Sequence, residues 1–195
     1  MGFKIAAFMI LAAFYGCYFA KMLAQRKKGI QTDQIGKKKH GITKGIECVL
    51  KVVTILVVIA ELVSIMLGTS RFPQWVRVVG IGFGAVGVAV FAAAVVTMQD
   101  NWRAGVSKTE KTELVTTGIF AYSRNPAFLG FDLVYIGIVV IFFNWPLFLM
   151  TAFAAVMLHL QIVNVEEPFL METFKDEYWN YKKHVNRYVG RKNNA

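Results

Sequence analysis

Five runs of apolar residues divide the chain, and polar segments of unequal length separate them. The runs cover about residues 3–24, 46–68, 75–98, 127–143 and 146–164. About 20 predominantly apolar residues are enough for an α-helix to cross a bilayer. The last two runs are shorter, and only the turn "NWP" separates them, which predicts a tight helical hairpin. The pattern therefore predicts an all-α polytopic membrane protein with about five transmembrane helices.

The remaining polar residues form segments that border these helices. The first run lacks a small-residue cleavage site and its basic cluster follows it, so we expect a helix and not a signal peptide. Aromatic residues recur at helical spacing in the tail 166–188, which predicts an amphipathic helix at the membrane surface. We expect two parts: residues 1–98 with three transmembrane helices, and residues 99–195 with a polar loop, the hairpin and the tail helix.

The net charge of +10 is unevenly distributed along the chain. The segments 21–44 and 99–126 and the tail after residue 165 are basic, whereas the short connections at 69–74 and 144–146 hold little charge. The positive-inside rule then places the N-terminus outside and the basic segments, including the C-terminus, in the cytoplasm. Topology and anionic lipid headgroups account for the charge without a nucleic-acid partner.

Several polar or small residues lie within the predicted helices. Glu47 and Lys51 are four residues apart and are expected to pair, whereas Glu61 lies deeper in the membrane. Gly80, Gly84 and Gly87 are typical of a close helix contact in lipid. The two cysteines lie in separate predicted helices, and no Cys/His spacing indicates a metal site.

The predicted hairpin brings rare polar residues to matching depths. Asn125 falls at the depth of Glu166, and Asp132 at the depth of His159. Helical spacing places Asn125 and Asp132 on one face, and His159 and Glu166 on another. Polar groups inside a bilayer usually face a cavity or a partner, so we expect a site between these helices. Two simpler readings stay open: a structural hydrogen bond between Asp132 and His159, and a solvated helix end at Glu166 and Glu167.

The residue types in this region suit a small zwitterion with a planar ring. Carboxylates (Glu166, Glu167) suit a cation, Arg124 suits a carboxylate, and aromatic faces (Phe120, Phe128) suit a ring or a sulfonium. S-adenosylmethionine has all of these groups. The chain has no GxGxxG sequence or P-loop that would indicate a Rossmann-type or nucleotide site.

Three segments together resemble the isoprenylcysteine carboxyl methyltransferase family and its phospholipid methyltransferase relatives. They are "LVTTGIFAYSRNPAFLG" (114–130), "EE" (166–167) and "FKDEYWNY" (174–181), and the resemblance covers about residues 99–188. It implies S-adenosylmethionine bound between the hairpin and the tail, by Glu113, Leu114, Val115, Phe120, Asn125, Pro126, Phe128, Glu166 and Glu167.

The chain departs from the family pattern at several positions. Phe120 and Phe128 replace the usual tyrosines, and Lys175 replaces a usual glycine. Ile162 stands where the family often has a basic residue thought to touch the acceptor carboxylate, which puts a prenylcysteine acceptor in question.

The function predicted from these features is methyl transfer from S-adenosylmethionine to a lipophilic acceptor that enters from the bilayer. Arg124 and Asn125 would close the cytoplasmic mouth of the donor pocket. A carboxylate acceptor needs no base, whereas His159 or Asp132 could help deprotonate an amine or a thiol. Two alternatives remain: an NADPH-dependent membrane reductase of the sterol reductase type, and a non-enzymatic relative. Dinucleotide phosphates prefer cations to the two carboxylates at 166–167, which disfavours the reductase.

Overall fold

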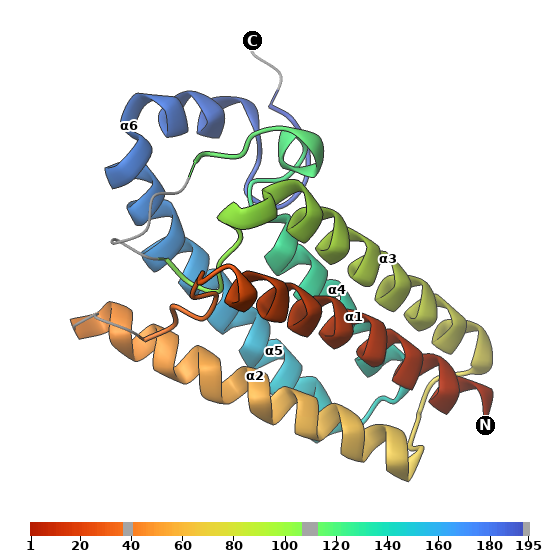
Figure 1. The fold of residues 1–195 in the computed structure, drawn as a ribbon. Helices are drawn as coiled ribbons and strands as arrows, with labels where there is room; N and C mark the ends of the chain where they lie inside the picture. The colour runs from red at the N-terminus through yellow and green to blue at the C-terminus, as the bar shows by residue number, and fades with distance from the viewer. Residues whose placement is uncertain (37–40, 107–112, 193–195) are drawn as a thin grey trace.

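The computed structural model describes residues 1–36, 41–106 and 113–192, and within these ranges the protein is all-α (Figure 1). The only β-type pairs in that part are isolated bridges, between Asp33 and Ala104 and between Val185 and Arg191. The α-helices are α1 (Gly2–Lys27), α2 (Gly41–Leu67), α3 (Gln74–Met98), α4 (Pro126–Ile141), α5 (Trp145–Gln161) and α6 (Glu167–His184). Three short turns are η1 (Gln99–Asn101), η2 (Gly118–Ala121) and η3 (Ile162–Glu166), the last of them a π-helix. The predicted fold class is confirmed.

Helix length and composition agree with an integral membrane protein. Four helices are long and apolar enough to cross a bilayer: α1, α2, the helix that begins at α3, and the continuous run Trp145–His184. The fifth predicted span is α4, an apolar helix of 16 residues. At 1.5 Å per residue α4 extends about 24 Å, slightly less than the ~30 Å hydrocarbon core. It packs along α3 and forms the predicted hairpin with α5 (Figure 1).

Glycines allow α3 and α4 to approach very closely. A Cβ atom on Gly137 of α4 would lie 2.7 Å from the backbone nitrogen of Gly84 in α3. One on Gly87 of α3 would lie 2.8 Å from the backbone nitrogen of Val134. Real side chains do not approach backbone this closely, so both positions require glycine. The close contact expected for Gly84 and Gly87 is confirmed, and its partner is the first helix of the hairpin.

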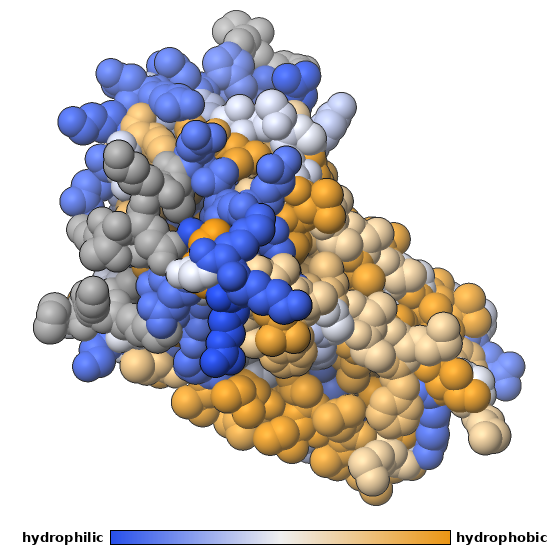
Figure 2. Space-filling model, in the orientation of Figure 1, coloured by the Kyte–Doolittle hydropathy of each residue, from blue (hydrophilic) through white to orange (hydrophobic). Residues whose placement is uncertain are grey.

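The polar part of the molecule lies at one end of the helices (Figure 2). The hydrophilic surface gathers over α6, the tail and the segments around them, whereas the helix flanks toward the N-terminus are hydrophobic (Figures 1 and 2). Residues 37–40 and 107–112, which belong to the basic segments of the sequence, lie outside the described residues.

A strap of two loop segments crosses this polar end. Gln34 N–H donates to the Ala104 carbonyl at 2.8 Å, and Ala104 N–H donates to the Thr32 carbonyl at 3.0 Å. Gln25, buried in the last turns of α1, joins the strap by donating to the Trp102 carbonyl at 2.8 Å and accepting from Thr32 at 2.7 Å. The strap fixes Trp102, which is 3% exposed, against the polar ends of the helices.

The predicted tail helix is present, and it continues directly from α5 through η3. Pro168 lies in its first turn, as expected. Lys175 breaks the regular helix, because its φ of 44° and ψ of −115° are not helical. A positive φ is easily adopted only by glycine, so the backbone at Lys175 is strained.

Candidate functional site

Arg124 and Asn125 lie at the entry to α4, and both are buried. Asn125 has a non-helical backbone, and Pro126 takes the first helical position, where no N–H is required. Asn125 N–H donates to Ser123 Oγ at 3.2 Å, and the Asn125 carbonyl accepts from Leu129 N–H at 3.1 Å. The polar turn is therefore the folded start of the helix and not a solvated flank.

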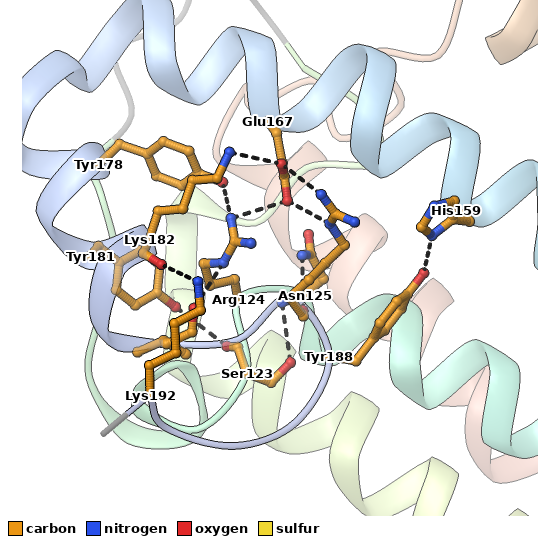
Figure 3. A network of polar contacts seen from close by, with 12 residues as sticks. Ser123, Arg124, Asn125, His159, Glu167, Tyr178, Tyr181, Lys182, Tyr188 and Lys192 are labelled. Atoms are coloured by element: carbon orange, nitrogen blue, oxygen red, sulfur yellow. Dashed lines mark hydrogen bonds and ion pairs between the residues drawn. The ribbon is translucent and has the colours of Figure 1, made fainter. Parts of the chain in front are cut away.

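Glu167 is the centre of a cluster of charged side chains (Figure 3). Its carboxylate oxygens lie 3.0 Å from Arg124 Nη1, 2.7 Å from Arg187 Nε and 3.4 Å from Lys182 Nζ. Arg187 adds a second bond through Nη2 at 3.1 Å, which makes the pair bidentate. The side chains of Arg124 and Glu167 are 4% and 8% exposed, so this pair is almost fully removed from solvent. One carboxylate thus joins the start of α4, the end of α6 and the tail.

The surroundings of Glu167 keep it ionised. Burial pushes the pKa of the Glu167 carboxyl upward, but the hydrogen bond from Arg187 and the charges of Arg124, Arg187 and Lys182 outweigh burial, and the pKa falls below its ordinary value. The hydrogen bond to Glu167 raises the pKa of Arg187. At neutral pH the Glu167 carboxylate is therefore negatively charged and the Arg187 guanidinium positively charged.

Backbone contacts hold the tail after α6 against the entry to α4. Arg124 donates through its backbone N–H to the Asn186 carbonyl at 3.1 Å and through Nε to the Val185 carbonyl at 3.1 Å. Asn125 Nδ2 donates to the Arg187 carbonyl at 3.1 Å. Tyr178, buried in α6, accepts from Arg124 Nη1 at 2.8 Å (Figure 3). The side chains of Arg124 and Asn125 are thus used largely to position the tail.

The two adjacent glutamates lie where the π-helical turn η3 meets α6, and they contact different partners. Glu167 faces the tail, whereas Glu166 Oε1 accepts a hydrogen bond from Gln161 Nε2 at 3.1 Å. Gln161 Nε2 also lies 3.3 Å from Glu47 Oε1 in α2, and Glu47 Oε2 accepts from Gly36 N–H at 2.6 Å. A single π-helical turn often marks a functional site in a helix. Glu166 and Gln161 therefore connect the hairpin to α2.

The ion pair expected between Glu47 and Lys51 is not present. Glu47 does not pair with Lys51, because Lys51 bonds Asp33 at 2.8 Å in the strap while Glu47 is used by Gln161 and Gly36. Both residues find partners from loops and other helices, which a pattern along one helix does not reveal.

The alternative that the sequence left open, a structural hydrogen bond between Asp132 and His159, is not formed. The Nδ1 atom of His159 lies 2.7 Å from the Tyr188 hydroxyl, and the two rings are stacked (Figure 3). The tail brings Tyr188 into the place that Asp132 was expected to fill. Burial raises the pKa of Tyr188, and the nearby Asp132 carboxylate raises it further. Among the described residues, Asp132 Oδ1 is buried with no hydrogen-bond partner.

The other residues expected to bind the cofactor are spread around the entry to α4. Phe120 is buried in η2, and its carbonyl accepts from the Tyr181 hydroxyl at 2.6 Å. Leu114 and Val115 are half-buried in the extended segment before η2. Glu113 is exposed, and its backbone N–H donates to Asn101 Oδ1 at 3.1 Å. The structure places these residues on the polar end of the molecule, with Glu113 outermost.

A cavity of about 370 Å³ lies between α1, α2, α4 and α5, below the strap. Phe128 and Gln161 line it where the hairpin meets the polar end, and Asp33, Lys51 and Arg103 line its charged edge. Most of its wall is apolar, and includes Tyr18, Phe19, Leu50, Ile55, Phe91, Trp102, Phe131 and Leu158.

Sequence reasoning missed the contributions of the first two helices and of the tail to this region. Trp102, an aromatic residue within a polar segment, was a signal that this segment packs against the helices. Gln161, a polar residue near the end of an apolar run, was another. Arg187 had no local signal, because it lies in a short basic tail that resembles any solvated terminus.

Comparison with known proteins gives two findings. The family model for phospholipid methyltransferase matches residues 75–177, which is more than half of the chain. The chain is also similar to Protein-S-isoprenylcysteine O-methyltransferase of Schizosaccharomyces pombe, with 31% identity over 107 residues. That match covers 54% of this chain and 45% of the yeast protein, so the chain spans less than half the length of this relative.

Proposed function

The chain belongs to the phospholipid methyltransferase family, and on that premise we propose that it transfers a methyl group from S-adenosylmethionine to a lipid-like acceptor. One observation carries the proposal: the apolar cavity reaches Phe128 and Gln161, and Gln161 is hydrogen-bonded to Glu166. A polar donor site therefore adjoins an apolar space within the helices, as methylation of a membrane-borne acceptor requires.

The residues at the polar end fit S-adenosylmethionine chemically. The donor molecule supplies a methyl carbon activated by a sulfonium, and it also has an ammonium, a carboxylate and an adenine ring. Glu166 suits a cationic group, and the faces of Phe120 and Phe128 suit the sulfonium or the ring. We propose that these residues hold the donor together with Glu113, Leu114, Val115, Asn125 and Pro126. Arg124 and Glu167 then support the site by fixing the tail beside it.

The chemistry requires alignment more than activation. A bond forms between the methyl carbon and an acceptor oxygen, nitrogen or sulfur while the carbon–sulfur bond breaks and its electron pair goes to sulfur. The protein aligns the two atoms and excludes water from them. A carboxylate acceptor needs no base. For an amine or thiol, we propose that His159, hydrogen-bonded to Tyr188, or Asp132 accepts the proton.

The two predicted parts of the chain then have different roles in the proposed reaction. We propose that residues 99–195 hold the donor and that residues 1–98 complete the acceptor side, since α1 and α2 supply much of the cavity wall. The matched family region begins at residue 75, so α3 and its contact with α4 belong to the common core. We propose that the basic polar end faces the cytoplasm and anionic lipid headgroups, with the N-terminus outside.

Calorimetric titration of S-adenosylmethionine into detergent-purified protein tests the proposal. We expect micromolar binding by the wild type and by Glu177→Gln, which alters an exposed glutamate of α6. We expect at least tenfold weaker binding by Glu166→Gln. No binding by folded wild-type protein refutes the donor site. Titration with NADPH then separates the reductase alternative, which the family match does not favour, from a non-enzymatic relative that binds neither.

A further inference from the structure

The end of the helices opposite α6, called the far end here, is basic as well. Figure 1 shows that the N-terminus, the α2–α3 connection and the α4–α5 turn lie together there. Its basic side chains are Lys4, Arg71 and Arg77. No Asp or Glu occurs in the segments that form this end, which are residues 1–32, 62–99 and 133–165. The polar end is the one proposed to face the cytoplasm, so cations at the far end run against the positive-inside bias.

Arg77, near the start of α3, is partly buried and held between two aromatic rings. Its Nε donates to the Ile141 carbonyl, at the end of α4, at 2.9 Å. Its guanidinium carbon lies 4.0 Å from the centre of the Phe3 ring and 5.2 Å from that of the Phe142 ring. Among the described residues, no carboxylate pairs with Arg77 and no acceptor bonds its Nη atoms. A partly desolvated cation without a counter-ion is costly, and an anion bound to the Nη groups removes that cost.

A hollow of about 420 Å³ lies beside Arg77, between the first residues of α1 and the first two turns of α3. It is lined by Met1, Gly2, Phe3, Gln74, Arg77 and Ile81. The phosphoglycerol head of a phospholipid has about ten non-hydrogen atoms. At the ~30 Å³ of a water molecule for each atom, this head occupies at most roughly 300 Å³. The hollow therefore has room for one such head against the guanidinium.

The surroundings of the hollow are those of a membrane interface. Trp75, next to Gln74, and Trp145, in the first turn of α5, are 71% and 55% exposed. Exposed tryptophans at the ends of membrane helices are typical of the level of the lipid headgroups. Both helices continue from the hollow with exposed apolar side chains, among them Met9 in α1 and Val78 in α3. A phosphate in the hollow thus has a surface for acyl chains beside it, which a dissolved anion does not use.

We infer that the hollow at Arg77 binds an anionic phospholipid, with the phosphate on the Nη groups of Arg77 and the acyl chains along α1 and α3. A zwitterionic headgroup is disfavoured, because its cationic group finds no carboxylate in the segments that form the far end. The bound lipid joins the starts of α1 and α3 to the end of α4, since Arg77 already bonds Ile141. The site lies at the opposite end of the helices from the proposed donor site, so it does not depend on the methyltransferase proposal.

Native mass spectrometry of the whole protein in an uncharged detergent tests the site. Dioleoylphosphatidylglycerol and dioleoylphosphatidylcholine share their acyl chains and a phosphate, but only the first has a net negative charge. We expect the wild type to retain one phosphatidylglycerol more than Arg77→Met does, with an affinity for that lipid at least about tenfold higher. The control Arg71→Met removes an exposed cation of the same end and should bind as the wild type does. Equal retention by the wild type and Arg77→Met overturns the site, and equal retention of the two lipids overturns its preference for an anion.

A second variant separates the loss of lipid from the loss of folding. Gln74→Glu keeps the bond from Arg77 to Ile141 and places a carboxylate in the hollow, where it repels a phosphate. Glutamate in the first turn of a helix is favourable, so the midpoint of thermal unfolding in lipid-free detergent should not fall. Phosphatidylglycerol retention should nevertheless fall as it does in Arg77→Met. Retention at the wild-type level by Gln74→Glu overturns the inference.

Inorganic phosphate separates a lipid site from a site for dissolved anions. Added phosphatidylglycerol should raise the thermal midpoint of the wild type more than that of Arg77→Met. Added inorganic phosphate at the same concentration should affect the two proteins equally, because it has no acyl chains to place along α1 and α3. A rise with inorganic phosphate that depends on Arg77 and matches the rise with lipid overturns the assignment to a phospholipid.

Discussion

The substitution Glu167→Gln should release the tail from the entry to α4. It removes the negative charge that three cations surround, and it leaves Arg124 buried without an ionic partner. Breaking a buried pair in this way costs ~3–5 kcal/mol. The contacts with Arg187 and Lys182 are about one-third exposed, so each adds at most ~1 kcal/mol. At about 1.4 kcal/mol per factor of ten, the total of ~3–7 kcal/mol should weaken tail docking by roughly two to five orders of magnitude.

Limited trypsin digestion measures this release directly. The end of α6 and the tail after it contain five trypsin sites: Lys182, Lys183, Arg187, Arg191 and Lys192. In the wild type and in the exposed control Glu177→Gln, we expect slow cleavage at Arg187, because its side chain is held by Glu167 and its carbonyl by Asn125. In Glu167→Gln, cleavage at Arg187 should be at least a hundredfold faster. Equal cleavage rates in all three proteins would show that the charge cluster does not hold the tail.

The neighbouring substitution Glu166→Gln should have the opposite pattern. Within residues 113–192, Glu166 bonds Gln161, whereas Glu167 bonds Arg187, so cleavage at Arg187 should stay slow while donor affinity falls. Adjacent helix residues point about 100° apart, so the two glutamates are expected to have separable effects. If both substitutions release the tail, their roles are not separate.

Three further predictions follow from backbone geometry and charge. Lys175→Gly should raise the midpoint of thermal unfolding in detergent. Relief of the positive φ is worth ~1–3 kcal/mol, which exceeds the ~0.5–1 kcal/mol entropy cost of glycine. A lower midpoint would contradict the strained backbone. Gly137→Val should lower the midpoint sharply or prevent folding, whereas Gly82→Val should be tolerated, because a Cβ on Gly82 meets no atom within 4 Å. Tail docking should be constant between about pH 5.5 and 8 and should weaken in acid. The pKa of Glu167 is lower in the folded state than the ~4.3 of the unfolded state. Its stabilisation is therefore complete above the unfolded pKa and is lost as the pH falls through the folded pKa. In Glu167→Gln this acid dependence of trypsin cleavage should disappear.

The helices were predictable because their determinants are local. Apolar runs of bilayer length gave α1, α2 and α3 within a few residues, and the "NWP" turn gave the hairpin. The glycines of α3 indicated a close contact, although only the structure identifies α4 as its partner. Hydrophobic length and small residues are properties of a single segment, and so a sequence reveals them directly.

The partners of the buried charged and polar groups were not predictable in the same way. Lys51, Glu47 and His159 each bond a loop, a tail or a helix that is distant in sequence. The depth of residues in the hairpin made Asp132 a possible hydrogen-bond partner of His159. That comparison does not include the tail, which places Tyr188 against His159. Tail residues 185–191 have no hydrophobic periodicity. They dock through backbone carbonyls and through Arg187. Composition alone does not distinguish such a docked tail from a solvated chain end.

The junction of α5 and α6 connects the two halves of the proposed reaction. Gln161 lies at the polar end of the cavity, Glu166 follows one π-helical turn later, and Glu167 fixes the tail against α4. These residues lie on one continuous helical run, so a shift of that run moves Gln161, the proposed donor contact at Glu166 and the tail together. Adjacent residues point about 100° apart around a helix, and so Glu166 and Glu167 face different partners. An ordinary α-helical turn here would rotate Glu167 away from Arg124. The tail after α6 would then lose the carboxylate that holds it against the entry to α4.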